Sequence, residues 1–313
     1  MNFKHIYVSA ALTLAACSFF SAPALSEVPC AESATTIPSQ VAPLHERVDA
    51  AVAYIRTKTD LVPEYAIVLG SGFDKFAEDV QNPVAIPYGD IPGFTASTAP
   101  GHKGELVLGT IESKNVVVMR GRIHLYEGLT AQQVVFPIQV MHGLGAKHLI
   151  VSNASGAIRN DLGLGELMVL KDHINMTGTN PCIGVNDNKI GPRFFPVSSS
   201  YDKPMARLAH EIAEKEGFKL SEGVYVGMLG PSYETYAENQ MLSRAGGDAV
   251  GMSTVLELIE GAHCNMSLFG VTCITDVLND EESENMEQTV IEMGEKACSN
   301  FTKLIHGILR AQK

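Results

Sequence analysis

Short β-rich runs alternate with amphipathic stretches along most of this chain, and this alternation limits the fold more than any other feature. Apolar residues at helical spacing predict a helix that begins at Leu44 and closes before Pro63. Further helices are expected near 130–145, 203–216, 234–245, 254–264 and 285–311, and strands at 65–69, 105–111, 115–119, 148–152, 223–229, 248–252 and 268–275. This order predicts an α/β fold, a single-domain sandwich in which helices flank a mixed central β-sheet.

The composition is that of a globular protein with a large core. The chain has 313 residues, of which 45% are hydrophobic, and it shows no internal repeat, low-complexity tract or linker. Its formal net charge of −12 disfavours nucleic acid and acidic membranes as partners, because the summed field repels both. We expect a flexible leader at 27–43 and one domain at 44–313. Because the net charge is negative, this domain must bind any anionic ligand through local hydrogen-bond donors.

Residues 1–26 have the pattern of a signal peptide. A basic start precedes an apolar stretch at 6–20 that is too short to span a membrane, and small residues follow it. Cleavage after Ala24 or after Ser26 fits this pattern. The run LAAC that ends at Cys17 also resembles a bacterial lipoprotein box, in which Cys17 would carry a lipid. We predict an exported, periplasmic protein that meets the membrane only if Cys17 is lipidated.

The cysteines of the domain do not form a recognisable framework. Cys182, Cys264, Cys273 and Cys298 lie far apart, without the close spacing of a disulfide scaffold or a zinc motif. Cys264 and Cys273 lie in apolar stretches, which favours small core residues over ligands or nucleophiles. The sequence predicts no metal site.

Small and polar residues follow several of the expected strands. Gly70-Ser71-Gly72 comes directly after the first strand, where glycine lets backbone N–H groups approach an oxyanion and Ser71 adds a hydroxyl donor. A tight turn is an equally good interpretation of this tripeptide alone, and no Gly-Lys-Ser/Thr follows to complete a P-loop.

Arg122, His124 and Tyr126 alternate just after another strand. If the segment is extended, the three side chains project to one face. A guanidinium matches two phosphate oxygens, His124 can donate a further bond, and Tyr126 can meet a sugar hydroxyl. Pro100-Gly101-His102 offers a second histidine on a loop, and such a histidine is by itself more typical of the surface.

Three further segments follow strands. The small residues of Ser152–Ile158 would let main-chain donors face a ligand, or make a simple bend. In Gly230–Thr235, Glu234 opens a helix and is either a cap or an acceptor for ring N–H groups of a base. In Val250–Thr254, Ser253 is an N-cap, an anion donor or both.

Taken in order, these segments resemble the trimeric, low-molecular-mass purine nucleoside phosphorylases, a family related to the methylthioadenosine phosphorylases. The resemblance extends from about Leu44 to Ile308. It rests on GSGF at 70–73, PGHKGELVLG at 100–109, GRIHLYEG at 121–128, VSNASGAI at 151–158, KDHIN at 171–175, GPSYET at 230–235 and AVGMST at 249–254.

The resemblance implies a site with three groups of contacts, one each for phosphate, ribose and purine. Phosphate would be bound by Ser71, His102, Arg122, His124, the backbone of Ala154, and Ser253. Tyr126 and Met252 would hold the ribose. The purine would be surrounded by Ala154, Gly156, Tyr225, Tyr233, Glu234 and Val250. Purine nucleoside and phosphate are the expected partners, and the family implies a homotrimer.

The implied reaction cleaves the bond between base and sugar with inorganic phosphate as a co-substrate, and it needs no metal or organic cofactor. A phosphate anion beneath the sugar stabilises the positive charge that develops there, and a donor near N7 helps the purine leave. His124, Glu234 and Asp276 are the expected catalytic residues.

Asp276 departs from the commonest family pattern, which has asparagine at this position. An ionised Asp276 accepts from a 6-amino group and a protonated one donates to N7, so we predict that adenosine-type substrates are accepted. The family histidine that meets the 5′-hydroxyl aligns roughly with Met286, and the aromatic residue from a neighbouring subunit aligns with Ile190.

Three other functions remain open on the sequence alone. The first is a methylthioadenosine phosphorylase, because those enzymes also carry Asp in a Thr-Asp pair and an apolar Met286 tolerates a methylthio group. GMST and GPSYET fit the nucleoside phosphorylases better. The second is a hydrolytic nucleosidase, and the third is an exported nucleoside-binding protein without catalysis. Neither of the last two needs the phosphate residues.

Overall fold

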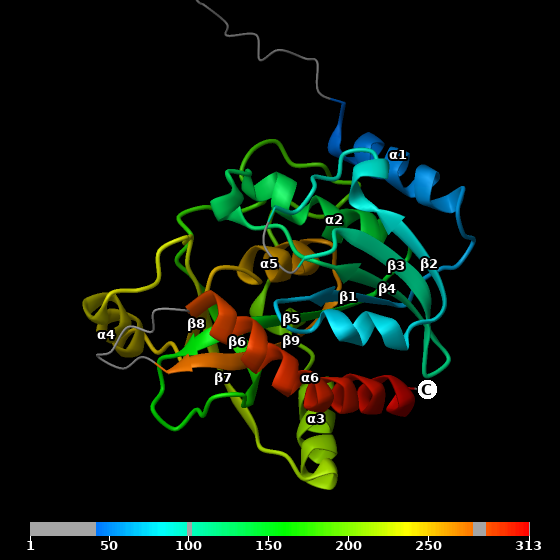
Figure 1. Cartoon of the computed structure of the whole chain (residues 1–313). Helices are drawn as coiled ribbons and strands as arrows, with labels where there is room; N and C mark the ends of the chain where they lie inside the picture. The colour runs from blue at the N-terminus through cyan, green and yellow to red at the C-terminus, as the bar shows by residue number, and fades with distance from the viewer. Residues whose placement is uncertain (1–41, 99–101, 278–285, 313) are drawn as a thin grey trace, which may run out of the picture. The chain divides into compact units, whose positions relative to one another are not determined.

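A mixed β-sheet forms the centre of the domain, as Figure 1 shows, and its inner strands are rich in β-branched and aliphatic residues. The structure is a computed structural model that describes residues 42–98, 102–277 and 286–312. Within these residues the sheet has nine strands in the order β2-β3-β4-β1-β5-β8-β7-β6-β9. Their bounds are β1 Tyr65–Leu69, β2 Gln81–Pro87, β3 Glu105–Ile111, β4 Lys114–Arg120, β5 His148–Ala157, β6 Leu167–Asn175, β7 Leu220–Gly227, β8 Ala249–Gly251 and β9 Ser267–Val277.

The sheet is mixed in direction, and part of it closes on itself. β1 pairs in parallel with β4 and β5, whereas β2, β3 and β4 form antiparallel pairs. β5 pairs with both β8 and β9, and β9 also pairs with β6, so that β5, β8, β7, β6 and β9 form a ring. The predicted fold class, helices around a mixed central sheet, is confirmed.

Helices cover the sheet on both sides. The α-helices are α1 Leu44–Arg56, α2 Ala131–Gly143, α3 Lys203–Glu216, α4 Tyr236–Arg244, α5 Val255–His263 and α6 Met286–Ala311. Short 3₁₀ helices lie at Asp74–Asp79, Tyr88–Asp90, Leu125–Glu127 and Ser198–Ser200. In Figure 1, α1, α2 and α5 lie on one side of the strands and α3 and α6 on the other. No helix in the described part of the chain has the length and apolar character that a membrane crossing requires.

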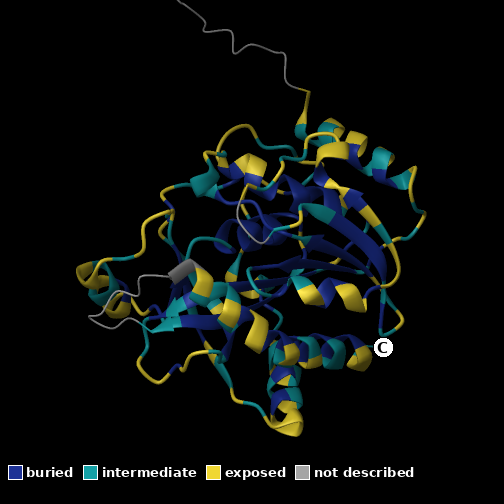
Figure 2. Ribbon diagram, viewed as in Figure 1, coloured by how far each residue is buried: buried dark blue, intermediate teal, exposed yellow. Residues whose placement is uncertain are grey.

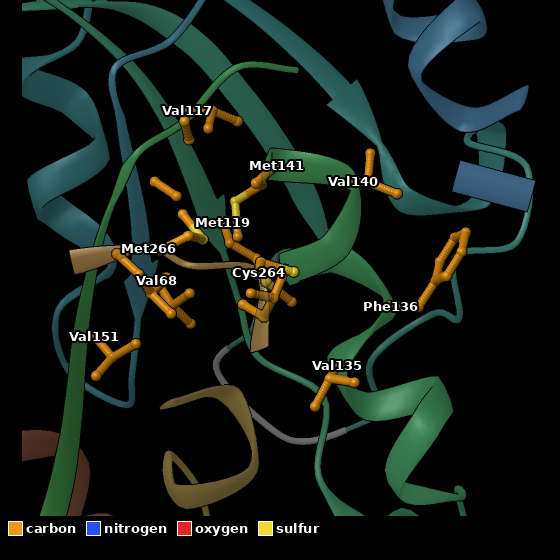
Figure 3. Packing of buried hydrophobic residues seen from close by; sticks show 14 of the residues in the cluster. Val68, Val117, Met119, Val135, Phe136, Val140, Met141, Val151, Cys264 and Met266 are labelled. Carbon is orange, nitrogen blue, oxygen red and sulfur yellow. The ribbon is translucent and has the colours of Figure 1, made fainter. Parts of the chain in front are cut away.

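The alternation of side chains along β1 explains the two cores. Ala66 and Val68 point to the core beneath α1, α2 and α5, while Tyr65, Ile67 and Leu69 point to the core beneath α3 and α6. Figure 3 shows part of the first core, in which strand and α2 side chains pack together. Figure 2 shows the resulting pattern, with buried strands and helices exposed on their outer faces. This packing fixes the strand ends that carry the site.

α5 differs from the other helices because every one of its residues is buried. Its sequence is apolar around the whole circumference except for Glu257, Glu260 and His263. A helix of this kind belongs in a protein interior, where each charged side chain needs a partner. These three residues therefore mark points at which the interior holds charge.

Three local predictions were wrong. The strand predicted at 148–152 continues to Ala157, because the small residues expected to form a bend instead pair with β9 across a bulge between Ser155 and Gly156. β2 and β6 were not predicted. β2 is an exposed edge strand with Pro83 inside it, and the second half of β6 is polar.

Candidate active site

A cavity lies where several strands end and helices begin, as expected for an α/β sheet. Its walls come from the ends of β1, β5, β8 and β9, from the segment after β4, and from α6. The residues that line it are Ser71, Arg122, His124, Tyr126, Asn153, Ala154, Ser155, Gly156, Tyr233, Glu234, Val250, Gly251, Met252, Ser253, Thr275, Asp276 and Val290. Most of the predicted site residues therefore meet in one cavity.

Arg122 is the buried cation of the cavity, with only 1% of its surface exposed. Its Nε donates to both oxygens of Glu257, at 2.9 and 3.0 Å, and its Nη1 donates to the carbonyl oxygen of Ser152 at 2.7 Å. Nη2 has no hydrogen-bond partner among the described residues. Because a buried donor without a partner is costly, the free Nη2 of a residue that lines the cavity marks a place for an acceptor.

Gly70 and Ser71 form the turn after β1 against this arginine. A Cβ on Gly70 would lie 2.6 Å from the carbonyl oxygen of Ser152 and 3.1 Å from Arg122 Nη1. Glycine is therefore required for the close approach of the two strand ends. The turn places Ser71 on the cavity wall, and its role as a hydroxyl donor stays a prediction.

His124 is held in place by Glu127. His124 Nδ1 lies 3.1 Å from Glu127 Oε1, and the His124 backbone N–H donates to the same oxygen at 2.7 Å. Burial raises the pKa of Glu127, but hydrogen bonds from His124 and Thr98 outweigh this effect and bring the pKa to about 2. The ionised Glu127 accepts a hydrogen bond from Nδ1–H, which fixes the orientation of the His124 ring and leaves Nε2 facing away from Glu127.

His102 packs next to His124. Its ring centroid is 5.5 Å from that of His124, yet His102 does not line the cavity. Burial, together with the positive charges of His124 and Arg122, lowers the pKa of His102 to about 4. His102 is therefore a neutral ring next to His124 at neutral pH.

The segment from β8 to α5 brings Ser253 into the cavity through an unusual backbone. Thr254 has a φ of 73°, which is strained for a β-branched residue. Its hydroxyl accepts from Asn153 Nδ2 at 2.8 Å and lies 3.1 Å from Ser253 Oγ. Thr254, and not Ser253, is the residue before α5, and its side chain makes no cap. The cap interpretation of Ser253 was wrong, which leaves its hydroxyl at the cavity wall.

Two carboxyl groups, from the segment after β7 and from β9, form another part of the cavity wall. Glu234 Oε1 is buried and has no hydrogen-bond partner among the described residues. Burial raises the pKa of Glu234, and the negative charges of Glu238 and Asp276 raise it further. Burial likewise raises the pKa of Asp276, against a hydrogen bond from the backbone of Val277. Both groups keep a proton to higher pH than usual and can act as donors or acceptors.

Glu234 does not open a helix, as the sequence had suggested. α4 begins at Tyr236, and its cap is Thr235, whose side chain accepts from the Glu238 backbone while the Glu238 carboxylate accepts from Thr235. Because the capping box satisfies the helix start, Glu234 is not used there.

Other parts of the cavity wall consist of apolar side chains or small residues. The Tyr126 ring stacks on the His124 ring with centroids 4.6 Å apart. A Cβ on Gly230 would lie 2.4 Å from Met252 Sδ and 3.4 Å from Tyr126 Cδ1, so the Gly230 loop packs closely on both residues. Ala154, Gly156 and Val250 complete this part of the wall.

Several predictions about single residues were wrong. The segment at 122–126 is not an extended strand, because Leu125–Glu127 forms a 3₁₀ helix, although Arg122, His124 and Tyr126 still line one cavity. Tyr225 does not line the cavity. It is fully buried behind Gly251, where an added Cβ would lie 2.4 Å from Tyr225 Oη.

The predictions for the two sugar-pocket positions, Ile190 and Met286, have different outcomes. Ile190 packs against the core beneath α1, α2 and α5 and does not line this chain's cavity. The side chain of Met286 lies outside the described residues, as do the predicted signal peptide and all but the last two residues of the leader.

Sequence reasoning missed two acidic residues that position the cations. Glu257 and Glu127 hold Arg122 and His124, and neither was assigned a role. Glu257 had one available signal, because it stands among apolar residues of a helix that must be buried. Asn153, which links β5 to Thr254, was also missed.

The comparisons with known proteins agree with this geometry. Residues 64–310 match the phosphorylase superfamily, the class that this fold and cavity define. Purine nucleoside phosphorylase 1 of Bacillus subtilis is 42% identical, over 85% of this chain and 98% of the relative. The purine nucleoside phosphorylase of Mus musculus is 36% identical, over 83% and 93%.

A solved structure of Schistosoma mansoni purine nucleoside phosphorylase in complex with adenosine is also similar. It has a TM-score of 0.81 and 37% identity, and the match covers 86% of this chain and 98% of that one. The chain belongs to the purine nucleoside phosphorylases of the phosphorylase superfamily.

Proposed function

We propose that this chain cleaves purine nucleosides with inorganic phosphate, to give the free purine base and ribose 1-phosphate. The observation that carries the proposal is the buried guanidinium of Arg122, fixed on two sides and with Nη2 free. A hydrolytic nucleosidase or a nucleoside-binding protein has no need of such a group. The relatives named as purine nucleoside phosphorylases support the same activity.

Phosphate would bind between Arg122, His124, Ser71 and Ser253, with the backbone of Ala154 beside it. Glu257 neutralises much of the Arg122 charge, so the site binds phosphate through an oriented donor more than through net charge. As the base departs, the sugar carbon becomes positive, and the phosphate next to it stabilises that charge and then forms the new bond. The donors are held before substrate arrives, so little reorganisation is needed.

The purine would bind at the Glu234 and Asp276 end, with Tyr126 and Met252 against the ribose. Glu234 Oε1 offers an acceptor for a ring N–H. A protonated Asp276 can donate to N7, which spares the purine from leaving as a bare anion. The proposed chemistry uses phosphate as a co-substrate and requires no metal or organic cofactor at this cavity.

The test is the phosphate dependence of base release from inosine. We expect rapid release of hypoxanthine in phosphate buffer and very slow release when phosphate is omitted. Equal rates in the two buffers would indicate a hydrolytic nucleosidase. Tight inosine binding without base release in either buffer would indicate a binding protein.

A second candidate function is the cleavage of nucleosides with a 6-amino purine, and Asp276 favours it. An ionised Asp276 accepts from a 6-amino group, so adenosine and methylthioadenosine are candidate substrates. The related Schistosoma mansoni enzyme has been crystallised with adenosine and with inosine. Rates with inosine, guanosine, adenosine and methylthioadenosine separate the possibilities. Negligible adenosine turnover with strong inosine preference would exclude a 6-amino preference, and fastest turnover of methylthioadenosine would indicate a methylthioadenosine phosphorylase.

Assembly and location are proposals from the sequence. The family resemblance supports a homotrimer, in which a neighbour would bring the segment around Ile190 to the sugar, and sedimentation equilibrium tests it. The signal-like pattern at 1–26 supports export to the periplasm. Mass spectrometry of the mature protein would distinguish cleavage after Ala24 or Ser26 from lipidation at Cys17.

A further inference from the structure

A second cluster of chemically active side chains lies at the far end of α5, away from the cavity. One ligand atom from each of Cys182, Glu260 and His263 lies within 4.8 Å of the other two. Glu260 and His263 are 1% and 4% exposed, and Cys182 is half-buried. Cys264 follows directly and is also buried, as Figure 3 shows for its place in the first core. These residues come from α5 and from the loop after β6, about 80 residues apart in sequence.

The carboxylate of Glu260 is the centre of this cluster. Its Oε1 lies 3.1 Å from His263 Nδ1 and 3.7 Å from Cys264 Sγ, and its Oε2 lies 3.6 Å from Cys182 Sγ. In a tetrahedral zinc site, metal–ligand bonds of about 2.0 to 2.3 Å place neighbouring ligand atoms roughly 3.3 to 3.8 Å apart. With one ligand atom from each residue, the atoms of Cys182, Glu260 and His263 lie within 4.8 Å of one another, so small side-chain movements would bring them to this spacing.

Supporting interactions surround the cluster. Gln139 Nε2, from α2, donates to Glu260 Oε1 at 2.9 Å and orients the carboxylate. His263 Nε2 and Gln139 Oε1 are buried and have no partner among the described residues.

A route from solvent reaches the cluster. His263 lines an open groove, together with residues of the segment 192–204 and of the turn after α5. Phe195 packs on the His263 ring with centroids 4.9 Å apart. Because Cys182 is also half-buried, an ion can reach the cluster without unfolding the core.

We propose that this cluster is a zinc site, with Cys182, Glu260 and His263 as ligands and the Cys264 thiol as a fourth donor. Thiolate and imidazole together with one carboxylate are ligands that Zn²⁺ accepts in four-coordinate sites. Binding releases the thiol protons to solvent and replaces the thiol–carboxylate hydrogen bonds by metal–ligand bonds. The close-set zinc spacing is absent from the sequence because the fold, and not the local chain, brings the ligands together.

The position of the site gives it a structural role. Glu260 is one helical turn from Glu257, which holds Arg122. An ion bound at Glu260 ties the loop at Cys182 to the end of the helix whose beginning supports the cavity. Zinc is therefore expected to raise thermal stability, because it binds the folded chain and its ligands are dispersed in the unfolded one.

The test uses untagged, reduced, chelator-treated protein titrated with Co²⁺ as a spectroscopic substitute for Zn²⁺. We expect one equivalent to bind, with the near-ultraviolet charge-transfer absorption of a cobalt–thiolate bond, and Zn²⁺ to displace it. Cys182→Ala should weaken this absorption strongly, and the Cys182→Ala/Cys264→Ala double variant should abolish it. Cys298→Ala is the matched control, because Cys298 is a buried cysteine in the other core, and it should behave as wild type.

Absence of the thiolate absorption in wild type would overturn the proposal, and so would an undiminished absorption in Cys182→Ala. If the variants fail to fold, alkylation of the wild type decides the matter. Zn²⁺ should then slow modification of Cys182 by at least about tenfold, and equal rates with and without Zn²⁺ would contradict the site. Neither readout depends on catalysis, so the zinc proposal and the proposed activity can fail separately.

Discussion

The two ends of the cavity differ in how their polar groups are held. At the proposed phosphate end, Arg122 is fixed by Glu257 and a backbone carbonyl, and His124 is fixed by Glu127. At the proposed base end, Glu234 Oε1 has no hydrogen-bond partner among the described residues, and burial raises the pKa of both Glu234 and Asp276. Hydrogen bonds fix the side chains of the first end before substrate binds. At the second end, the raised pKa values let the carboxyl groups gain or lose a proton more readily near neutral pH.

This difference corresponds to two chemical tasks. Phosphate has the same shape and charge in every turnover, so a rigid set of donors serves it well. Purines differ in their 6-substituent and must accept a proton or a hydrogen bond as they leave, which suits carboxyl groups of shifted pKa. Substitutions at the phosphate end should therefore remove activity for all nucleosides, and those at the base end should redistribute it among them.

The largest effect is expected for Arg122→Ala. Loss of the oriented donor should lower kcat/KM with phosphate by about 10² to 10³, or about 3 to 4 kcal/mol, for every nucleoside. Nucleoside binding should change little, as calorimetry would show. Glu257 would become an unpaired buried charge, so the free energy of unfolding should fall by about 3 kcal/mol.

The double variant Arg122→Ala/Glu257→Gln is the control for that loss of stability. It should regain most of the stability, because the unpaired charge is gone, and none of the activity. Recovery of phosphorolysis in the double variant would contradict the role of Arg122.

Glu234→Ala should give the next largest effect and should act on the base. Removing the acceptor is expected to raise KM for nucleosides and lower kcat/KM by about 2 kcal/mol, or roughly 30-fold. KM for phosphate should stay within about twofold of wild type. An equal loss of phosphate affinity would show that the two ends do not act separately.

Asp276→Asn should change selectivity more than rate. The amide presents both a donor and an acceptor, which suits a 6-oxo purine, so the ratio of kcat/KM for inosine over adenosine should rise by about tenfold. Competition between the two nucleosides in one reaction measures this ratio directly. An unchanged ratio would remove Asp276 from base selection.

The smallest expected effect is a change in the pH dependence of stability when His102 is replaced. The folded-state pKa of about 4 lies below the ordinary value of 6.5, so the unfolded chain takes up this proton first. Stability should therefore fall as pH decreases from about 6.5 to about 4, and His102→Gln should show a weaker fall in this window. Urea unfolding at several pH values in phosphate-free buffer measures the difference. Identical slopes for both proteins would contradict the lowered pKa of His102.

Much of the fold could be predicted because its strands are continuous apolar runs. β1 and α3 have the predicted bounds, since each has a sharp pattern and a clear end signal at Gly70 or Gly217. β2 and β6 could not be predicted in the same way. Their polar residues are placed in strands by pairing with β3, β7 and β9, which is information that local sequence does not contain.

The motif residues of the site could be predicted from the sequence, whereas the residues that hold them in position could not. Motif residues such as Ser71, Arg122 and Ser253 meet in one cavity. Glu257 is 135 positions from Arg122, and only the folded sheet and α5 bring the two together. Tyr225 does not line the cavity because Gly251 covers its hydroxyl, and the sequence alone does not show that β8 lies between this side chain and the cavity.

Phosphorus NMR of a reaction with inosine tests the central claim most directly. We expect inorganic phosphate to be converted into ribose 1-phosphate in step with hypoxanthine release, and Arg122→Ala to produce almost none. Release of hypoxanthine while the phosphate signal stays unchanged would contradict it.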